Sequence, residues 1–188
     1  MGEYKSFDEI RILLEQDVPV LIDEAYIEFS DRDSLINEIN NYSNLLITRT
    51  FSKGFGAAGC RVGMVFSNEE NIELISKFRH MYEITGVSMK YCEFLLDNYS
   101  VVNEYIENVK VEKKKIISSL SNDFNVIDSD CNWIHFNNEI DNVDTIKIFE
   151  AHKVLVKYCS IPHDDRKNWC RLTIQPEMSN FDFIKELI

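Results

Sequence analysis

The feature that most constrains this chain is a glycine-rich segment between two short apolar runs. Residues 50–63 read TFSKGFGAAGCRVG, and four of these fourteen residues are glycines. The apolar run 45–48 leads into the segment, and the run 62–66 leaves it. Short apolar runs bounded by glycine are typical of buried strands. The segment is therefore predicted to be a tight connection between two strands, where glycine lets the backbone approach another group closely.

The side chains of this segment suit a phosphate group. The hydroxyls of Thr50 and Ser52 can donate hydrogen bonds, and Arg61 offers a two-pronged charged donor. Lys53 lies among them. A lysine amine with a low enough pKa is a nucleophile toward aldehydes and forms a Schiff base. A phosphate site beside such a lysine predicts pyridoxal phosphate as the cofactor.

Two nucleotide-binding patterns are the alternatives for this segment. A Walker loop reads G-x-x-x-x-G-K-[ST], whereas Lys53 here precedes the glycines. Residues 54–59 do match G-x-G-x-x-G, but that pattern expects an acidic residue about 20 positions later at the end of a strand. The acidic residues at 69–70 come too early and follow a polar turn. The dinucleotide interpretation is therefore disfavoured.

The composition restricts the partners and the compartment. The net charge is −12, which argues against nucleic acid and against an anionic membrane surface. A hydrophobic content of 45% is enough for a core, yet no apolar run is long enough to span a bilayer. No basic segment followed by an apolar one opens the chain. A cytoplasmic protein is expected.

The cysteines and histidines do not predict a metal site. The five cysteines are odd in number and form no C-x-x-C pair, so reduced thiols are expected. The histidines are scattered, and each is predicted to be a core or surface residue rather than a ligand. The residues are Cys60, Cys92, Cys131, Cys159, Cys170, His80, His135, His152 and His163.

The first part of the chain alternates helix and strand. Residues 6–16 combine a Ser6–Glu9 capping box with helical apolar spacing. The wholly apolar run 20–22 predicts a strand covered on both faces, and Asp23 follows at its carboxyl end, where α/β folds place their sites. A short amphipathic helix is expected at 33–39. This order predicts an α/β fold with a parallel or mixed sheet.

The later part of the chain has a different pattern. Residues 88–120 predict a long helix, interrupted near 97–100. Beyond residue 121, an α+β unit is expected. Its predicted strands are 132–136, 154–158 and 170–174, and its predicted helices are 144–151 and 179–188. The predicted division is residues 1–87 as a large cofactor domain, 88–120 as a connecting helix and 121–188 as a small domain.

Asp23 and Tyr26 complete the set expected around a pyridoxal ring. The ring withdraws electrons only while its nitrogen is protonated, and a carboxylate against that nitrogen raises the pKa of the nitrogen. Asp23, after its strand, is placed for this role. Tyr26, three residues later, can hydrogen-bond the oxygen of the ring hydroxyl.

These residues carry a family resemblance. The motifs D-E-A-Y at 23–26 and T-F-S-K-x-x-x-x-A-G-x-R-x-G from residue 50 resemble fold-type I, class I/II aminotransferases. Within that class, the chain looks like the histidinol-phosphate aminotransferases. The resemblance implies that Lys53 carries the cofactor and moves the substrate proton. It also implies that Arg171 and Asn132 bind a small amino donor or 2-oxo acid, and that the protein is a homodimer.

Two departures from the family pattern leave alternatives open. Family chains are about twice as long, so the resemblance covers only their C-terminal part; an interaction module without turnover is one alternative. Lys157 stands where histidinol-phosphate enzymes usually carry a second anion-binding arginine. Lysine keeps the charge but loses the forked donor geometry. Transaminases of other amino acids, and decarboxylases of phosphorylated amino acids, therefore remain alternatives.

Overall fold

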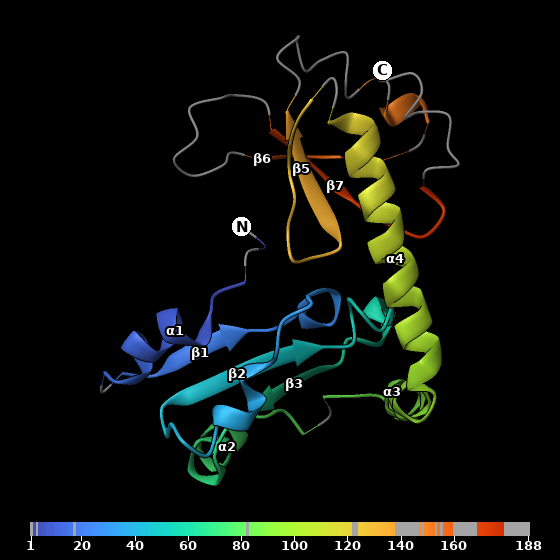
Figure 1. The fold of residues 1–188 in the computed structure, drawn as a ribbon. Helices are drawn as coiled ribbons and strands as arrows, with labels where there is room; N and C mark the ends of the chain where they lie inside the picture. The colour runs from blue at the N-terminus through green and yellow to red at the C-terminus, as the bar shows by residue number, and fades with distance from the viewer. Residues whose placement is uncertain are drawn as a thin grey trace. The chain divides into compact units, whose positions relative to one another are not determined.

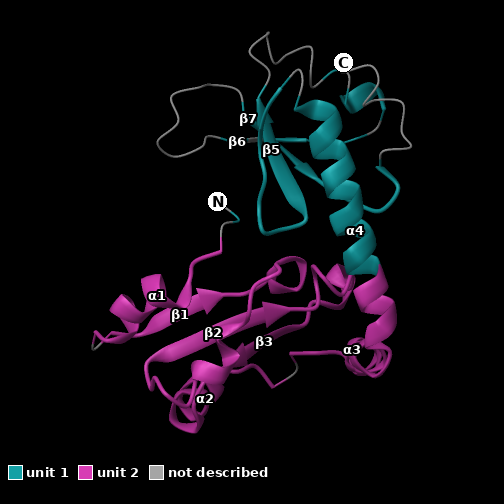
Figure 2. Ribbon diagram, in the orientation of Figure 1, with its two compact units in different colours: residues 1–3, 105–188 teal, residues 4–104 magenta. Residues whose placement is uncertain are grey.

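The fold is seen in a computed structural model, which forms two compact units, residues 4–104 and residues 1–3 with 105–188 (Figure 2). The structure describes the chain except residues 1, 3, 17, 82, 122–123, 138–146, 148, 153, 155, 160–168 and 179–188. Each unit is built around its own sheet. The sequence-based division at residues 87 and 120 remains a prediction.

The unit 4–104 contains a three-stranded mixed sheet (Figure 1). Its strands are β1 (Val20–Asp23), β2 (Leu45–Thr50) and β3 (Gly63–Phe66), in that order. β1 and β2 are parallel, and β3 is antiparallel to β2. The segment between them therefore reverses the direction of the chain. The predicted strands and the α/β class are confirmed.

The core of this unit lies between the sheet and α1 (Phe7–Leu14). Ser6 caps α1 as predicted, because its hydroxyl accepts from the backbone of Glu9 and the Glu9 carboxylate accepts from the backbone of Ser6. On the inner face of the helix, Ile10 and Leu14 pack against the strands. The core residues contributed by the strands are Val20, Leu45 and Ile47.

Two local predictions in this unit are wrong. Strand β1 is covered on one face only, since the Leu21 side chain is 63% exposed. The helix expected at 33–39 is a short 3₁₀ helix, η2 (Leu35–Glu38). Ser34 accepts from the backbone of Ile36, and the Glu24 carboxylate accepts from the backbone of Leu35. These two contacts satisfy the free donors of a single turn without requiring a longer helix.

Three helices follow β3 along the chain. Asn68 caps α2 (Glu69–Ser76), and Thr85 caps α3 (Gly86–Asp97). The predicted break near 97–100 is confirmed, because α3 ends at Asp97 and its C-cap Asn98 separates it from α4 (Tyr99–Leu120). None of the helices in the described parts of the chain is long and apolar enough to cross a membrane.

The other unit is an antiparallel sheet with the order β4-β5-β7-β6. Its strands are β4 (Asn125–Ile127), β5 (Trp133–Asn137), β6 (Lys157–Cys159) and β7 (Trp169–Thr173). All five residues of β5 are buried. Phe136 shows why, because it lies between Phe124 and Phe149, with ring centroids 5.7 and 5.5 Å away.

The remaining predictions for this unit have mixed outcomes. The strand expected at 170–174 is confirmed as β7, and the strand expected at 154–158 appears later, as β6. Strand β4 had no predicted counterpart. The helix expected at 179–188 lies outside the described residues, as do residues 144–146 and 148 of the helix expected at 144–151, whereas residues 147 and 149–151 are helical. All five cysteines are free thiols.

A buried ion pair ties together the carboxyl ends of β1 and β2. The Glu24 carboxylate, only 6% exposed, accepts from Arg49 Nε at 3.0 Å and lies 3.0 Å from Arg49 Nη2. It also accepts from the Ser34 hydroxyl at 2.7 Å and from the Leu35 backbone at 2.8 Å. Both oxygens of the carboxylate are therefore hydrogen-bonded, as a buried charge requires.

The core residue Ile47 gives the first prediction. Its side chain is fully buried, so Ile47→Ala is expected to lower the free energy of unfolding by roughly 2 to 5 kcal/mol. The matched control is Leu21→Ala on the exposed face, with an expected change within about 0.5 kcal/mol. Urea denaturation measures both. Equal losses in the two variants would contradict this description of the core.

The Glu24–Arg49 pair gives the second prediction. Arg49→Met leaves a buried carboxylate without its cation, so we expect a loss of about 3 kcal/mol in the free energy of unfolding. The double variant Glu24→Met, Arg49→Met removes both charges and should recover part of that loss. Urea denaturation of the three chains is the measurement. A double variant less stable than Arg49→Met would refute the pairing.

Candidate functional site

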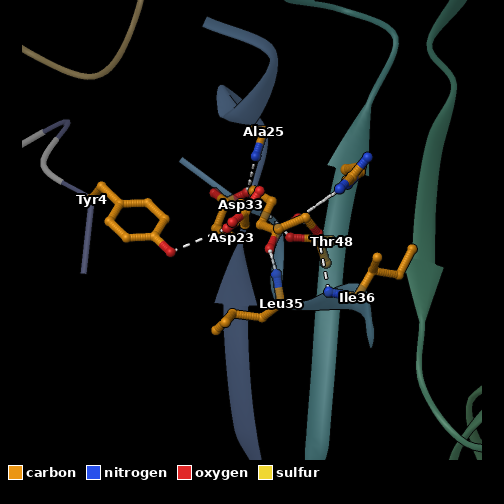
Figure 3. A network of polar contacts seen from close by, with 10 residues as sticks. Tyr4, Asp23, Ala25, Asp33, Leu35, Ile36 and Thr48 are labelled. Carbon is orange, nitrogen blue, oxygen red and sulfur yellow. Dashed lines mark hydrogen bonds and ion pairs between the residues drawn. The ribbon is translucent and has the colours of Figure 1, made fainter. Parts of the chain in front are cut away.

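Asp23 ends β1 with its carboxylate exposed and oriented by two donors. Asp23 Oδ1 accepts from the backbone N–H of Ala25 and from the hydroxyl of Thr48, both at 3.1 Å (Figure 3). Within the described parts of the chain, no donor lies on Oδ2. One carboxylate oxygen is therefore engaged, and the other can accept a hydrogen bond from a ligand.

Lys53 lies against the segment that follows Asp23. Its Nζ is 5.2 Å from the centroid of the Tyr26 ring, a distance at which a cation is attracted to the face of a ring. The lysine is half-buried, and its ammonium forms no ion pair with any residue that the structure describes. Lys53 and the 23–26 segment, far apart in sequence, thus meet within one unit.

The 50–63 segment is a turn closed by its own hydrogen bonds. The hydroxyl of Thr50 donates to the carbonyl of Val62 at 3.3 Å and accepts from the backbone N–H of Ser52 at 3.1 Å. The backbone of Phe51 donates to the same carbonyl and accepts from Ala57 at 2.8 Å. The single O–H donor predicted for a phosphate at Thr50 is therefore used inside the turn.

Close packing at one position and a left-handed backbone at two others explain the glycines of the turn and its backbone strain. A Cβ added at Gly54 would lie 2.7 Å from the Cβ of Glu28, so no side chain fits there. Gly56 has φ +65°, a left-handed conformation that glycine adopts freely. Arg61 has φ 54° and ψ 39°, in the same region, at a cost of about 1 kcal/mol for a residue with a Cβ.

Glu28 is a residue of this site that the sequence did not predict. It lies in the 3₁₀ helix η1 (Ile27–Phe29), against Gly54. Its Oε2 is buried, without a hydrogen-bond partner among the described residues. Burial raises the pKa of this carboxyl. An isolated acidic residue after Tyr26 carries no sequence signal of burial, so only the fold reveals it.

A second group of predicted residues lies in the other unit. Arg171 on β7 is directly opposite His135 of β5 on one side and Lys157 of β6 on the other. Directly opposite residues share a sheet face, so two cations and one imidazole form a row. Burial is the largest cause that lowers the pKa of His135, and the charge of Arg171 makes a smaller contribution in the same direction, which favours the neutral imidazole.

Arg171 has an unused donor within this row. Its guanidinium carbon lies 5.5 Å from the ring centroid of Trp133, and its Nε is buried without a hydrogen-bond partner in the described structure. Asn132, just before β5, is buried, and its carbonyl accepts from the backbone of Ile174. The sequence did not predict the role of Trp133 and His135 as neighbours of Arg171. How this row lies relative to Lys53 remains a prediction.

Solved structures show the same fold. A histidinol-phosphate aminotransferase from Sinorhizobium meliloti, in complex with pyridoxal-5'-phosphate, matches with a TM-score of 0.74 and 19% identity, over 90% of this chain and 46% of that one. An L-threonine-O-3-phosphate decarboxylase from Porphyromonas gingivalis matches with a TM-score of 0.84 and 20% identity, over 99% and 59%. At such identities, the likeness concerns the fold alone.

Sequence comparison identifies the family. A histidinol-phosphate aminotransferase of Crocosphaera subtropica is 33% identical over 171 residues, which are 90% of this chain and 48% of the relative. The chain spans about half the length of the curated relatives it matches. The model of the aminotransferase class I and II family matches residues 2–183. The chain therefore belongs to the class I and II aminotransferases, a family that depends on pyridoxal phosphate.

Proposed function

We propose that this chain carries the cofactor and substrate residues of an aminotransferase of the histidinol-phosphate type. The reaction moves an amino group between an amino acid, or a phosphorylated amine, and a 2-oxo acid. One observation carries the proposal: Lys53 Nζ lies over the ring of Tyr26. Tyr26 is three residues after Asp23, whose Oδ2 accepts no hydrogen bond from the described residues. The relatives named histidinol-phosphate aminotransferase support this type of aminotransferase within the family.

The described residues fit pyridoxal phosphate by the chemistry of their donors. Asp23 presents Oδ2 to a ring nitrogen, and Tyr26 can hydrogen-bond a ring hydroxyl. The turn offers Ser52 and Arg61 to a phosphate, and Thr50 joins them when its hydroxyl turns from the carbonyl of Val62 to the ligand. Together, these five residues can contact the ring nitrogen, the ring hydroxyl and the phosphate of one pyridoxal phosphate molecule.

The roles of the residues follow from their chemistry. When bound, the cofactor supplies an electron sink that stabilises negative charge on the substrate carbon. Lys53 Nζ would accept the proton that leaves the substrate carbon and hold it until it is returned. Asp23 keeps a positive charge at the ring nitrogen, because a carboxylate favours the protonated form of a neighbouring base. Arg61 holds the phosphate with its forked donors.

The row on β5, β7 and β6 is proposed to bind the anionic group of the substrate. Arg171 supplies an unused buried donor, and Lys157 adds a second positive charge directly beside it. Asn132 supplies an amide close to the same strands. A small amino donor and a 2-oxo acid would both present a carboxylate to these residues. A homodimer is proposed as the working assembly, as the family resemblance implies.

Two alternative functions are each favoured by one observation. Lys157 in place of a forked arginine favours a related enzyme, such as a decarboxylase of a phosphorylated amino acid. The exposed apolar side chains of Leu21 and Val65 favour a catalytically incomplete unit that binds another polypeptide. Assays for amine transfer and for carbon dioxide release, with a panel of amino acids and phosphorylated amines, distinguish the three functions.

Lys53 provides the direct test of the cofactor. The chain saturated with pyridoxal phosphate is expected to show a visible absorption band that Lys53→Ala abolishes, because no other amine is proposed to bond the cofactor. Lys77→Ala, at an exposed helix end, is the control and should keep the band. A folded wild-type chain that stays colourless would refute the proposed function.

Arg171 provides the test of the substrate site. Arg171→Gln is expected to lower kcat/KM for anionic substrates roughly 10- to 100-fold, the contribution of a hydrogen bond to a charged group. The visible band of the cofactor should stay unchanged. Steady-state kinetics and absorption spectra on the same samples make the comparison. Loss of the band together with activity would instead indicate that Arg171 supports the fold.

A further inference from the structure

Thr48 lies beside Asp23 in the parallel pair of β1 and β2. The two residues are directly opposite in the register, and the hydroxyl of Thr48 donates to Asp23 Oδ1 at 3.1 Å (Figure 3). The backbone of Ala25 donates to the same oxygen, also at 3.1 Å. Both donors are therefore on one oxygen, and the described residues leave the other oxygen open.

This geometry restricts the rotation of the carboxylate. The terminal torsion of an aspartate is broad and roughly two-fold, so an exposed carboxylate without partners samples many orientations. The two donors that converge on Oδ1 select one of these orientations. Oδ2 is then held ready for a ligand, and the entropy of orienting it is lost on folding rather than on binding.

The strand itself does not need the hydroxyl of Thr48. Threonine and valine are both β-branched and suit a strand equally, so valine would serve the backbone as well. The backbone beside Asp23 has its own supports, a hydrogen bond from Glu24 N to the carbonyl of Thr48 and the Glu24–Arg49 ion pair. The contact from the Thr48 hydroxyl therefore acts on the carboxylate alone.

We infer that Thr48 is a positioning residue for the cofactor, acting through Asp23. Its hydroxyl fixes the orientation in which Asp23 Oδ2 meets a protonated ring nitrogen. This inference rests on the proposed function, since it assigns how the same site aligns its ligand. It goes beyond that function by giving a role to a residue outside both sequence motifs.

Binding and spectra of two matched variants test the inference. Thr48→Val keeps the shape and removes the hydroxyl, whereas Thr48→Ser keeps the hydroxyl. Titration of each full chain with pyridoxal phosphate should give about tenfold weaker binding for Thr48→Val, within the range for a hydrogen bond to a charged group. Thr48→Ser should bind within about threefold of wild type. The pH at which the visible band of the bound cofactor changes should also move in Thr48→Val alone.

A double-variant cycle shows whether Thr48 acts through Asp23. In an Asp23→Ala background, Thr48→Val should weaken binding no further, because the group it orients is absent. Additive losses would overturn the inference, as would wild-type affinity and spectra in Thr48→Val. Urea denaturation of every variant checks that the changes do not come from unfolding. Wild-type chain that binds no cofactor would refute the proposed function itself, and the inference with it.

Discussion

The parallel pairing of β1 with β2 is the constraint on which the candidate site depends. Parallel neighbours end on the same side of a sheet, so the residues that follow them meet there. Asp23 ends β1 and Tyr26 follows it, and the turn with Lys53 follows β2. The Glu24–Arg49 ion pair is buried at this same end of the pair and ties one strand to the other. The backbone pairing of β1 with β2 and the Glu24–Arg49 ion pair therefore hold the motifs at 23–26 and 50–63 next to each other.

The turn between β2 and β3 is the second constraint. The chain reverses direction here, because β3 is antiparallel to β2, and the polar side chains of the turn stay at the end of the strand. Gly54 lets the backbone pass against Glu28, and the hydroxyl of Thr50 closes the loop onto Val62. The tight turn places Lys53 beside Tyr26, but its internal hydrogen bond from Thr50 uses a donor that a phosphate would otherwise accept.

The sequence predicted those features that have a local cause. The capping box at Ser6, the strands on either side of the turn and the break near Asn98 each follow from residue types within a few positions. The sequence did not predict the 3₁₀ helix at 35–38, because its cause is the carboxylate of Glu24, eleven residues away. Glu28, Thr48 and His135 were missed for a similar reason. Their neighbours are set by strand register and packing, which a single sequence does not display.

The left-handed backbone of Arg61 has a consequence for how this chain can change. Glycine adopts that conformation freely, so the fold by itself would be relieved by losing the side chain there. With the proposed phosphate role of Arg61, folding and ligand recognition favour different residues at this position. A lineage released from the need to grip an anion would drift toward glycine at this residue while keeping its core. The identity of this one residue then reports whether the turn still serves a ligand.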